Sequence, residues 1–444
     1  MSKSNYDYDV VFIGAGHGSD GAPLLANQGY KVAKIEAEAV GGTCTNWGCN
    51  AKLVLDGPVQ LSRTQERMKN VVNGDLAMNW AANMKYKHEV IDPLAGGLEN
   101  KFIKAGIDVL HGWATLKDPH TIDIDGTTKT ADKIVIATGL HPNQLDIPGT
   151  ELAHNSKDFL ALDNLPAHIV IVGSGYIAME FATIANQFGA DVTVMMHGDK
   201  ALRKFYQPFA EAIVDDLTKR GVKFVRNANV SAFKESDGKL SVEYGDGQSQ
   251  PTDWILDATG RVPNVSGYGL DELGIKYNRH GIEVNDHLQT NVPNIFAAGD
   301  ITDTVYPNLT PSATFQSKYI ARFISGETNE PIDHPVIPSV TFTSPRIAEA
   351  GVPVAKAIDD DRYQVVFTDL TKDWFRQVDH QDLAKQALVF NQDHRLVGVT
   401  EMSEQADNAI DSLLPAIALQ MTPKQIQSII PLFPSITHEV WKKL

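Results

Sequence analysis

One pattern of apolar strand, glycine turn, helix and second strand occurs twice in this chain of 444 residues. The first copy reads "YDVVFIGAGHGSDGAPLLANQGYKVAKIE" (residues 8–36), and the second reads "HIVIVGSGYIAMEFATIANQFGADVTVMMHGDK" (residues 168–200). A lone G-x-G-x-x-G is weak evidence, because glycine turns before helices are common, but two complete strand-turn-helix copies are strong evidence. The sequence therefore predicts an α/β protein with two Rossmann-like dinucleotide-binding domains.

The first copy places small residues where a pyrophosphate would approach the backbone. Gly14 would permit the tight turn, Gly16 would let the pyrophosphate come close, and Ser19 takes the third small position. Glu36 ends the second strand about twenty residues beyond Gly16, where a ribose hydroxyl would find its acceptor. An enzyme with two such sites usually passes electrons between a nicotinamide and a flavin.

The second copy has Gly173, Gly175 and Ala178 at the same positions, but no carboxylate ends its second strand. Basic side chains follow instead, namely those of His197, Lys200, Arg203 and Lys204. Such residues suit a 2′-phosphate, so the sequence favours NADPH over NADH. The alternative is that these are ordinary solvated charges after a strand.

The charge and the apolar runs narrow the possible partners. The formal net charge of −16 would repel phosphate backbones and anionic lipid surfaces, and no basic cluster reverses it, so nucleic-acid binding is not expected. No stretch reaches the roughly 18 apolar residues that a membrane span needs. The start, "MSKSNYDYDV", lacks a basic region followed by an apolar run, so we expect a cytoplasmic protein without membrane attachment.

The chain has only two cysteines, Cys44 and Cys49, both in "GGTCTNWGC". Two cysteines in a large chain without a secretion signal do not make a disulfide-stapled scaffold. Their closeness therefore indicates either redox chemistry or two inert buried thiols.

The two glycine-rich strand-turn-helix copies are called the first and second fingerprints below. Together with several short motifs, they make the chain resemble the flavoprotein disulfide reductases, a family that includes glutathione reductase, dihydrolipoamide dehydrogenase and mercuric reductase. The motifs are "GGTCTNWGC" (41–49), "IVIATG" (134–139), "ATGRVPN" (258–264), "NIFAAGD" (294–300) and "LTPSA" (309–313). The resemblance covers nearly the whole chain. It implies FAD in the first dinucleotide site, a nicotinamide cofactor in the second, and no metal site.

The resemblance also implies a domain organisation. A discontinuous FAD-binding domain would comprise residues 1–150 and 280–335, with the NAD(P)-binding domain of residues 151–279 inserted. Residues 336–444 would form an α+β dimerisation domain that makes a homodimer and lends residues to the partner's active site.

Further cofactor-binding positions follow from the family's motifs. Asp300 would hydrogen-bond the ribityl chain of the flavin. Tyr176 would cover the flavin until the nicotinamide arrives, although helix packing is an equally simple role for it. The other implied positions are Gly42, Thr43, Thr138, Gly139, Gly260, Arg261, Gly299, Thr310 and Ala313.

By the same resemblance, Cys44 and Cys49 are the redox-active C-x4-C disulfide. Cys49, nearer the following helix, would lie against the flavin as a thiolate stabilised by the helix N-terminus. Cys44 would attack an incoming disulfide. Lys52 would approach the flavin and pair with Glu180, but "CNAK" is one residue shorter than the family's segment, so an ordinary exposed helix lysine is the alternative.

The chain departs further from the family near its end. The family's H-P-T-x-x-E segment, whose histidine shuttles the thiol proton across the dimer, corresponds to "FPSITHE" (433–439). Phe433 stands in place of the base and cannot carry a proton. His438, on the orienting position, could substitute from a shifted backbone, or the substrate needs no such acid. The third alternative is that His438 is a surface histidine near a chain end.

These observations leave three functional hypotheses. The first is an NADPH-dependent FAD oxidoreductase that passes electrons through Cys44 and Cys49 to a disulfide or related small acceptor other than glutathione disulfide or lipoamide. The second is a reductase that acts directly from the flavin on a quinone, an activated alkene or a metal ion, with non-essential cysteines. The third is a flavin-bearing component of a larger assembly.

Overall fold

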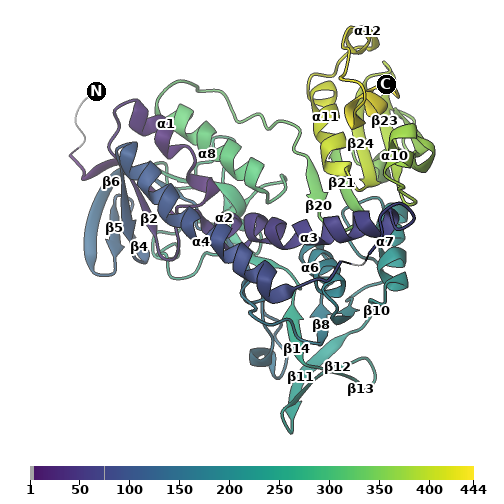
Figure 1. The fold of residues 1–444 in the computed structure, drawn as a ribbon. Coiled ribbons are helices and arrows are strands. Elements are labelled where there is room, and N and C mark those ends of the chain that lie inside the picture. The colour runs from purple at the N-terminus through teal and green to yellow at the C-terminus, as the bar shows by residue number, and fades with distance from the viewer. Residues whose placement is uncertain (1–4, 75) are drawn as a thin grey trace. The chain divides into compact units, whose positions relative to one another are not determined.

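The computed structural model describes residues 5–74 and 76–444, which form two compact units (Figure 1). The first unit contains residues 5–54, 85–143 and 261–334. The second contains residues 55–74, 76–84, 144–260 and 335–444. No helix in these ranges is long and apolar enough to cross a membrane.

The first unit is built on a sheet with strand order β3-β2-β1-β6-β5-β4, in which β18 also pairs with β6. The pairs among β1, β2, β3, β6 and β18 are parallel, whereas β4 and β5 join antiparallel. The strands are β1 (Tyr8–Ile13), β2 (Val32–Glu36), β3 (Ile107–His111), β4 (Ala114–Asp118), β5 (Thr121–Ile124), β6 (Thr127–Ile136) and β18 (Ile295–Ala297). The apolar run of β1 is buried on both faces, as expected for a central parallel strand.

The predicted strand-turn-helix-strand order of residues 8–36 is confirmed. β1 ends at Ile13, and a short 3₁₀ turn, η1 (His17–Ser19), precedes α1 (Ala22–Asn27) and β2. Gly14 has φ +107°, and a Cβ there would lie 2.4 Å from the carbonyl oxygen of Ala137. Only glycine fits this turn without strain. Figure 1 shows α1 beside α8 (Thr310–Ile324).

The second unit repeats the arrangement in a smaller parallel sheet with order β10-β9-β8-β14. The predicted order of residues 168–200 is confirmed by β8 (His168–Val172), α6 (Tyr176–Gln187) and β9 (Asp191–Met195), although β9 ends before His197. The remaining strands are β10 (Lys223–Val225) and β14 (Trp254–Asp257), with a separate antiparallel sheet of β11 (Val230–Ser236), β12 (Lys239–Tyr244) and β13 (Gln248–Thr252). The predicted α/β class with two Rossmann-like sheets is therefore confirmed.

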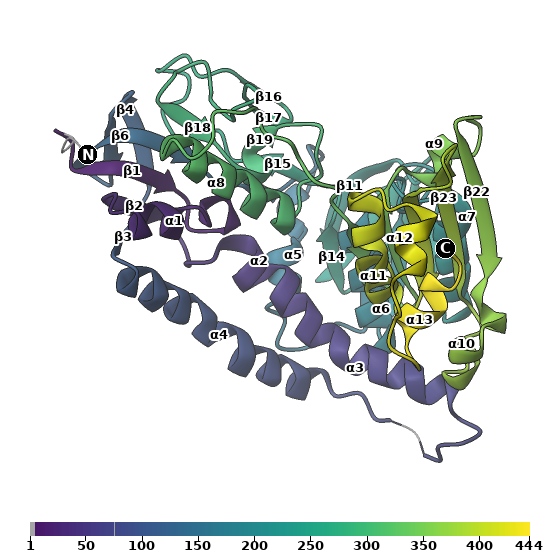
Figure 2. The same cartoon turned by 90° about the horizontal axis from the view of Figure 1, so that it is seen from above.

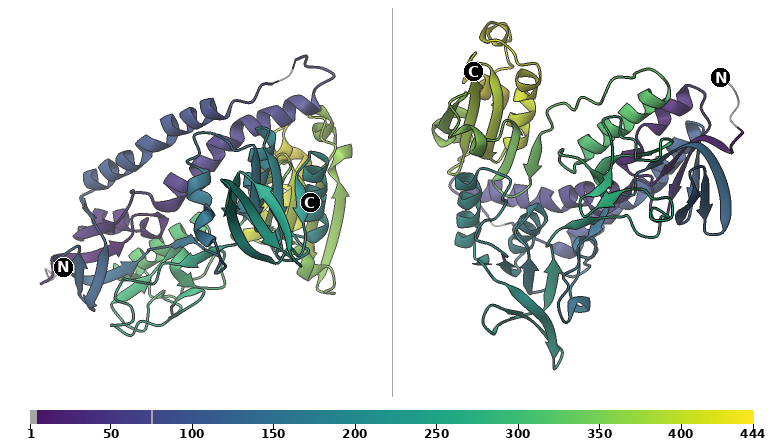
Figure 3. Two further views of the ribbon diagram at one scale, coloured as in Figure 1. Left: turned by 90° about the horizontal axis from the view of Figure 1, so that it is seen from below. Right: turned by 180° about the vertical axis from the view of Figure 1, so that it is seen from behind.

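Residues 339–444 form an antiparallel sheet with order β20-β21-β24-β23-β22. Its strands are β20 (Ser339–Thr341), β21 (Arg346–Gly351), β22 (Tyr363–Asp369), β23 (Lys385–Asn391) and β24 (Leu396–Ser403). α11 (Ala406–Ala418) packs on β21 and β24 and buries Ile410 and Leu413 against the sheet (Figure 2). Figure 3 shows this yellow helix with its sheet in two further views.

The other elements are short segments and two long helices. The long helices are α3 (Cys49–Arg67) and α4 (Trp80–Lys104). The shorter helices are α2 (Gly42–Trp47), η2 (Thr150–Leu152), α5 (Ser156–Phe159), α7 (Gln207–Lys219), η3 (Gly299–Ile301), α9 (Val354–Ala357), η4 (Leu370–Lys372), α10 (Trp374–Val378), α12 (Pro423–Gln427) and α13 (Ile436–Trp441). The short strands are β7 (Leu140–Pro142), β15 (Arg261–Pro263), β16 (Tyr277–Asn278), β17 (Gly281–Glu283) and β19 (Thr302–Asp303).

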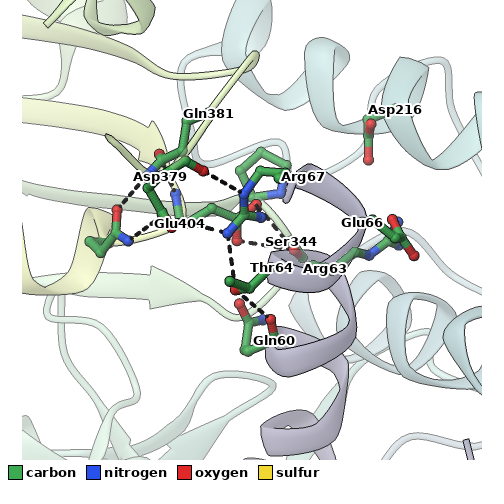
Figure 4. A network of polar contacts seen from close by, with 12 residues as sticks. Gln60, Arg63, Thr64, Glu66, Arg67, Asp216, Ser344, Asp379, Gln381 and Glu404 are labelled. Atoms are coloured by element: carbon green, nitrogen blue, oxygen red, sulfur yellow. Dashed lines mark hydrogen bonds and ion pairs between the residues drawn. The ribbon is translucent and has the colours of Figure 1, made fainter. Parts of the chain in front are cut away.

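Within the second unit, a buried polar network joins the end of α3 to the C-terminal residues (Figure 4). Arg67 lies 2.9 Å from Glu404 and 3.5 Å from Asp379. Burial raises the pKa of Glu404, and the charge of Arg67 opposes that rise. A buried carboxylate needs such partners, so this network fixes α3 against the segment that carries Glu404.

Lys34 is an unusual member of the first unit's core. It lies in the middle of β2 with its side chain fully buried, and its Nζ has no hydrogen-bond partner among the described residues. Nζ stands 3.6 Å from the centroid of the Phe102 ring. Burial lowers the pKa of this amine to about 7, and the carboxylates of Asp20 and Glu36 oppose the shift.

We therefore expect Lys34→Met to stabilise the protein near neutral pH. An unfolded lysine has a pKa near 10.4, so the folded state disfavours the proton that the unfolded chain holds between about pH 7 and pH 10. The variant should gain about 2–4 kcal/mol at pH 7, and the gain should shrink as the pH rises toward 10. Denaturant unfolding at several pH values measures it. Lys117→Met, which changes an exposed lysine of β4, is the matched control and should show no such trend.

Candidate functional site

The first fingerprint turn is held by the carboxylate that sequence analysis assigned to the ribose. Ala15 N–H donates to Glu36 Oε2 at 2.9 Å, and Glu38 N–H donates to Glu36 Oε1 at 3.0 Å. Each oxygen retains a second lone pair for a ligand hydroxyl. The structure thus places Glu36 directly at the turn that contains Gly14 and Gly16.

The three small residues of this turn have different local roles. Gly14 is required by the protein backbone itself, as its close approach to Ala137 shows. A Cβ on Gly16 would meet no described atom closer than 3.7 Å, so the protein does not require glycine there. Ser19 is buried and its Oγ donates to the Gly16 carbonyl at 2.7 Å, so its side chain supports the turn. The open side of Gly16 is the space that a dinucleotide backbone would fill, and the residues present fit FAD.

The start of α2 packs directly on this turn. Gly41 N–H donates to the Ala15 carbonyl at 3.0 Å, and a Cβ on Gly42 would lie 3.1 Å from the Cα of Gly16. Thr43 is exposed in the first turn of α2. The loop that leads to the cysteines therefore packs directly against the first fingerprint turn.

The cysteines stand where α2 ends and α3 begins. Cys44 lies half-buried in α2, Cys49 is the exposed first residue of α3, and no disulfide joins the two. The hydrogen bond between the two sulfurs, together with burial, raises the pKa of Cys44 above its usual range, while a hydrogen bond from Thr310 opposes the rise. Charge on one sulfur disfavours charge on the other, so the pair ionises one thiol at a time.

Thr310 and Asp300 were both predicted to contact the cofactor. Thr310 is the first residue of α8 and hydrogen-bonds Cys44, and its contact with the cofactor stays a prediction. Burial raises the pKa of Asp300, and Arg261 opposes that rise. Asp300 is thus a buried carboxyl group that can accept or donate a hydrogen bond to a polar ligand chain.

Gly299 and Ala313 pack against each other. A Cβ on Gly299 would lie 3.1 Å from the Cβ of Ala313, and Gly299 N–H donates to Gln316 Oε1 at 2.7 Å. Gln316 is buried and was missed by sequence analysis. No local pattern marks it, because its role depends on α8 packing against a segment distant in sequence.

The residues that follow the two A-T-G segments meet in a small antiparallel ladder of β7 with β15. Thr138 Oγ1 donates to the Asn264 carbonyl at 3.0 Å, and Asn264 N–H donates to the Gly139 carbonyl at 3.0 Å. Arg261 Nη2 donates to the Leu140 carbonyl. Gly260, just before this ladder, has φ +151°. Thr138, Gly139 and Arg261 therefore all make contacts within the chain.

The second fingerprint repeats the geometry of the first. Gly173 has φ +126°, and a Cβ there would lie 2.4 Å from the Ala258 carbonyl oxygen. Around Gly175 no described atom would lie within 4 Å of a Cβ. Ala178 is buried in α6, and Tyr176 is 51% exposed at its first turn. Open space at Gly175 again fits a dinucleotide that approaches the helix N-terminus.

The residues predicted to bind the 2′-phosphate of NADPH lie in one loop after β9. Leu202 N–H donates to the Ser174 carbonyl at 2.9 Å, which holds this loop against the second fingerprint. His197, Lys200 and Arg203 are exposed. Lys204 is exposed as well, but its charge acts on the half-buried carboxyl of Glu349, whose pKa burial raises to about 7.

Sequence analysis missed Arg226 at this site. Arg226 follows β10 and donates to the carbonyl of Asp199 and to the carboxylate of Glu211. The carboxyl ends of parallel strands lie at one edge of a sheet, so the residue after β10 belongs beside the residues after β9. Sequence analysis did not identify β10 as a strand because it is only three residues long.

Lys52 and Glu180 belong to different units, and their pairing remains a prediction. Lys52 lies in the first turn of α3, and its backbone N–H donates to the Gly48 carbonyl at 2.9 Å. Glu180 is buried in α6, and its Oε1 accepts the Phe342 N–H at 2.9 Å.

His438 lies among aromatic rings near the end of the chain. Its ring meets that of Phe433 edge to face at 5.0 Å, and Phe433 stacks on Trp374 at 6.4 Å. Phe433 and Trp374 are 64% and 55% exposed. His438 Nδ1 is buried without a hydrogen-bond partner in residues 5–74 and 76–444. In the same ranges, no cluster of three or more His, Cys, Asp or Glu side chains could hold a metal ion.

Comparison with known proteins agrees with this geometry. The sequence pattern of the pyridine nucleotide-disulphide oxidoreductases matches residues 8–317, and that of their dimerisation domain matches residues 337–444. The chain is 31% identical to a glutathione reductase from Nostoc sp., with 98% of both chains covered. It is 31% identical to a mercuric reductase from Staphylococcus aureus, with 94% of this chain and 78% of that one covered.

A solved structure shares the fold. The HOCl-induced flavoprotein disulfide reductase RclA from Escherichia coli superposes with a TM-score of 0.88 at 24% identity, with 98% of both chains covered. One assignment follows from the two fingerprints, the loop with the paired cysteines, and the family patterns, which together span nearly the whole sequence. The chain is a member of the pyridine nucleotide-disulphide oxidoreductase family, a flavin-dependent oxidoreductase with a C-terminal dimerisation domain.

Proposed function

We propose that this enzyme uses NADPH and FAD to reduce Cys44 and Cys49, and passes the electrons on to a disulfide or related small acceptor. The observation that carries the proposal is the hydrogen-bonded pair of thiols at the junction of α2 and α3. The loop before α2 packs on the first dinucleotide turn through Gly42 and Gly16. This arrangement supports electron transfer between a flavin in that turn and the two sulfurs.

Each part of the chain has a role in this proposal. Bound FAD would supply the two-electron chemistry that links a nicotinamide to a disulfide. Glu36 and Asp300 would hold the polar parts of FAD, and the open side of Gly16 would admit its pyrophosphate. Cys44 would attack the acceptor, while Cys49, at the first turn of α3, would carry the thiolate charge.

The acceptor is proposed to differ from those of the named relatives. Glutathione reductases and a mercuric reductase are among the proteins similar to this chain. Phe433 replaces the family's proton carrier, and its exposed ring stacks on Trp374. An apolar pair of rings suits a flat or apolar acceptor better than the charged glutathione disulfide. Direct reduction of a quinone, an activated alkene or a metal ion from the flavin is the second candidate.

We further propose a cytoplasmic homodimer with a composite active site. The match to the dimerisation domain at residues 337–444 supports the dimer. In that dimer, His438 and Phe433 would face the cysteines of the partner subunit. The domain limits would be residues 1–150 with 280–335, 151–279, and 336–444.

Anaerobic titration with NADPH tests the proposed function. Two-electron reduction should produce a long-wavelength absorbance band, because a thiolate against an oxidised flavin transfers charge to it. Cys49→Ser should abolish the band, and Cys44→Ser should abolish turnover with the acceptor. Bleaching without such a band, combined with full turnover by Cys44→Ser, would instead establish direct flavin chemistry.

Arg203→Glu tests the choice of nicotinamide. Loss of one charge-assisted contact to a 2′-phosphate should raise the KM for NADPH about tenfold and leave the KM for NADH nearly unchanged. Steady-state kinetics with both cofactors measure this. Lys239→Glu, on the exposed surface of β12, carries the same charge change and should affect neither KM. Equal use of both cofactors by the unmodified enzyme would contradict the NADPH preference.

The two glycines of the second fingerprint separate folding from cofactor binding. Gly173→Ala should lower the thermal midpoint, because its Cβ would collide with the Ala258 carbonyl oxygen. Gly175→Ala should keep the thermal midpoint within a few degrees and weaken nicotinamide binding about tenfold, because the methyl group enters the ligand's space. Calorimetry and cofactor titration on both variants give the comparison. Tight NADPH binding by Gly175→Ala would place the cofactor elsewhere.

A further inference from the structure

A histidine and an aspartate form a pair inside the first fingerprint turn. His17 Nδ1 lies 2.9 Å from Asp20 Oδ2, and Thr314 Oγ1 donates to the same oxygen at 2.6 Å. Both members of the pair are about two-thirds buried, with 33% and 28% of their side chains exposed. An aspartate on Nδ1 orients the imidazole and leaves Nε2 for a second partner.

Helix α8 holds this pair and the cysteines along one face. Thr310, its first residue, hydrogen-bonds Cys44, and Thr314, one turn later, hydrogen-bonds Asp20. Side chains four residues apart on a helix are neighbours, about 5–6 Å apart at Cβ. The cysteine pair and the His17–Asp20 pair therefore contact neighbouring turns of the same helix.

The backbone brings the same two groups together independently of α8. A Cβ on Gly42 would lie 3.1 Å from the Cα of Gly16. His17 directly follows Gly16, and Cys44 comes two residues after Gly42. Two separate packing contacts thus bring the segment that carries His17 close to the loop that carries the sulfurs.

The charges around His17 favour its protonated form. The bond to Asp20 raises the pKa of His17, burial opposes the rise, and the negative charge of Cys49 adds to it. Lys34 is the other charged group that acts on the imidazole, and it lowers the pKa. Asp20 itself keeps a pKa below its usual value, because its bonds to His17 and Thr314 outweigh burial.

We propose that His17 is the acid-base group of the Cys44–Cys49 pair, and that Asp20 is the residue that positions it. The inference rests on the thiol chemistry proposed above. It supplies, from the same unit as the cysteines, the proton donor that Phe433 does not provide.

The step balances in atoms and charge. NADPH would supply two electrons and one proton, and solvent a second proton, so breaking the S–S bond would leave Cys44 as a thiol, Cys49 as a thiolate and His17 as an imidazolium. The proton of Cys44 then passes to Cys49, which makes Cys44 the attacking thiolate. When Cys44 attacks an acceptor disulfide, the S–S bond of the acceptor breaks and its first thiolate leaves with the proton of His17. Cys49 then attacks Cys44, re-forms the S–S bond, and releases the second acceptor thiol with the remaining proton. The acceptor disulfide has gained two electrons and two protons.

The test measures thiolate formation without using activity. The purified holoenzyme is reduced with dithiothreitol, and the rate of alkylation of Cys44 and Cys49 by iodoacetamide is followed by mass spectrometry from pH 5 to pH 10. Removal of the neighbouring cation should raise the pH midpoint of alkylation by about one unit in His17→Gln, which is about tenfold slower alkylation near pH 7. Asp20→Asn should shift it in the same direction.

Two further variants make the result decisive. His88→Gln removes a histidine from a surface pair with Asp92, at 3.0 Å, and should leave the midpoint unchanged. Thr314→Val keeps the imidazole and removes one hydrogen bond to Asp20, so it tests the positioning if His17→Gln does not fold. An upward shift of the alkylation midpoint in Thr314→Val that is smaller than the shift in His17→Gln supports the proposal.

An unchanged midpoint in His17→Gln overturns the proposal. If that variant also loses flavin absorbance, His17 serves the phosphates of the cofactor instead. These results differ from a failure of the proposed function, in which Cys44→Ser keeps full turnover whatever His17 does.

Discussion

Both dinucleotide sites depend on one backbone contact that leaves no room for a side chain. In each unit, a Cβ on the first fingerprint glycine would lie 2.4 Å from an alanine carbonyl oxygen, that of Ala137 for Gly14 and that of Ala258 for Gly173. The N–H groups of these alanines donate back to the last carbonyls of β1 and β8, each at 2.8 Å. The turn after the first strand is therefore formed against the segment that follows a neighbouring parallel strand. Because the turn is fixed in this way, the next glycine can remain open for a ligand.

The alanines belong to the two A-T-G segments, which sequence analysis gave only as motifs shared with the family. The structure gives these segments a role, because each covers a fingerprint turn. Thr138 and Thr259 then use their hydroxyls within the chain, on the Asn264 carbonyl and the Asp257 carboxylate. Resemblance alone suggested Thr138 as a cofactor ligand. The packing shows that this motif supports the first fingerprint turn.

The sequence predicted most of the fold, because both fingerprints combine strong apolar strands with glycines at fixed spacing. The sequence also indicated that Glu36 lies at the first fingerprint turn, because the motif is local in the chain. The roles of Glu36, Cys44 and Cys49 stay predictions. It did not predict Arg226, Gln316 or the His17–Asp20 pair. Arg226 and Gln316 depend on segments that meet only after folding. His17 and Asp20 are only three residues apart, but no local pattern marks a histidine within G-x-G-x-x-G as functional. The contact of Asp20 with Thr314 of α8 is long-range.

The electrostatics of the first turn explain why a histidine and a buried lysine are tolerated there. Glu36 and Asp20 place two carboxylates close to the backbone that would receive a pyrophosphate, and an anion there needs compensating charge. The imidazole of His17 bonds one carboxylate, while the amine of Lys34 acts on both. Burial of Lys34 opposes its protonation, so its compensation weakens near neutral pH, whereas His17 is stabilised as a cation by direct contact with Asp20. His17 therefore stays protonated to higher pH in this turn than its usual value allows, and it is also the cation on which the charge of Cys49 acts.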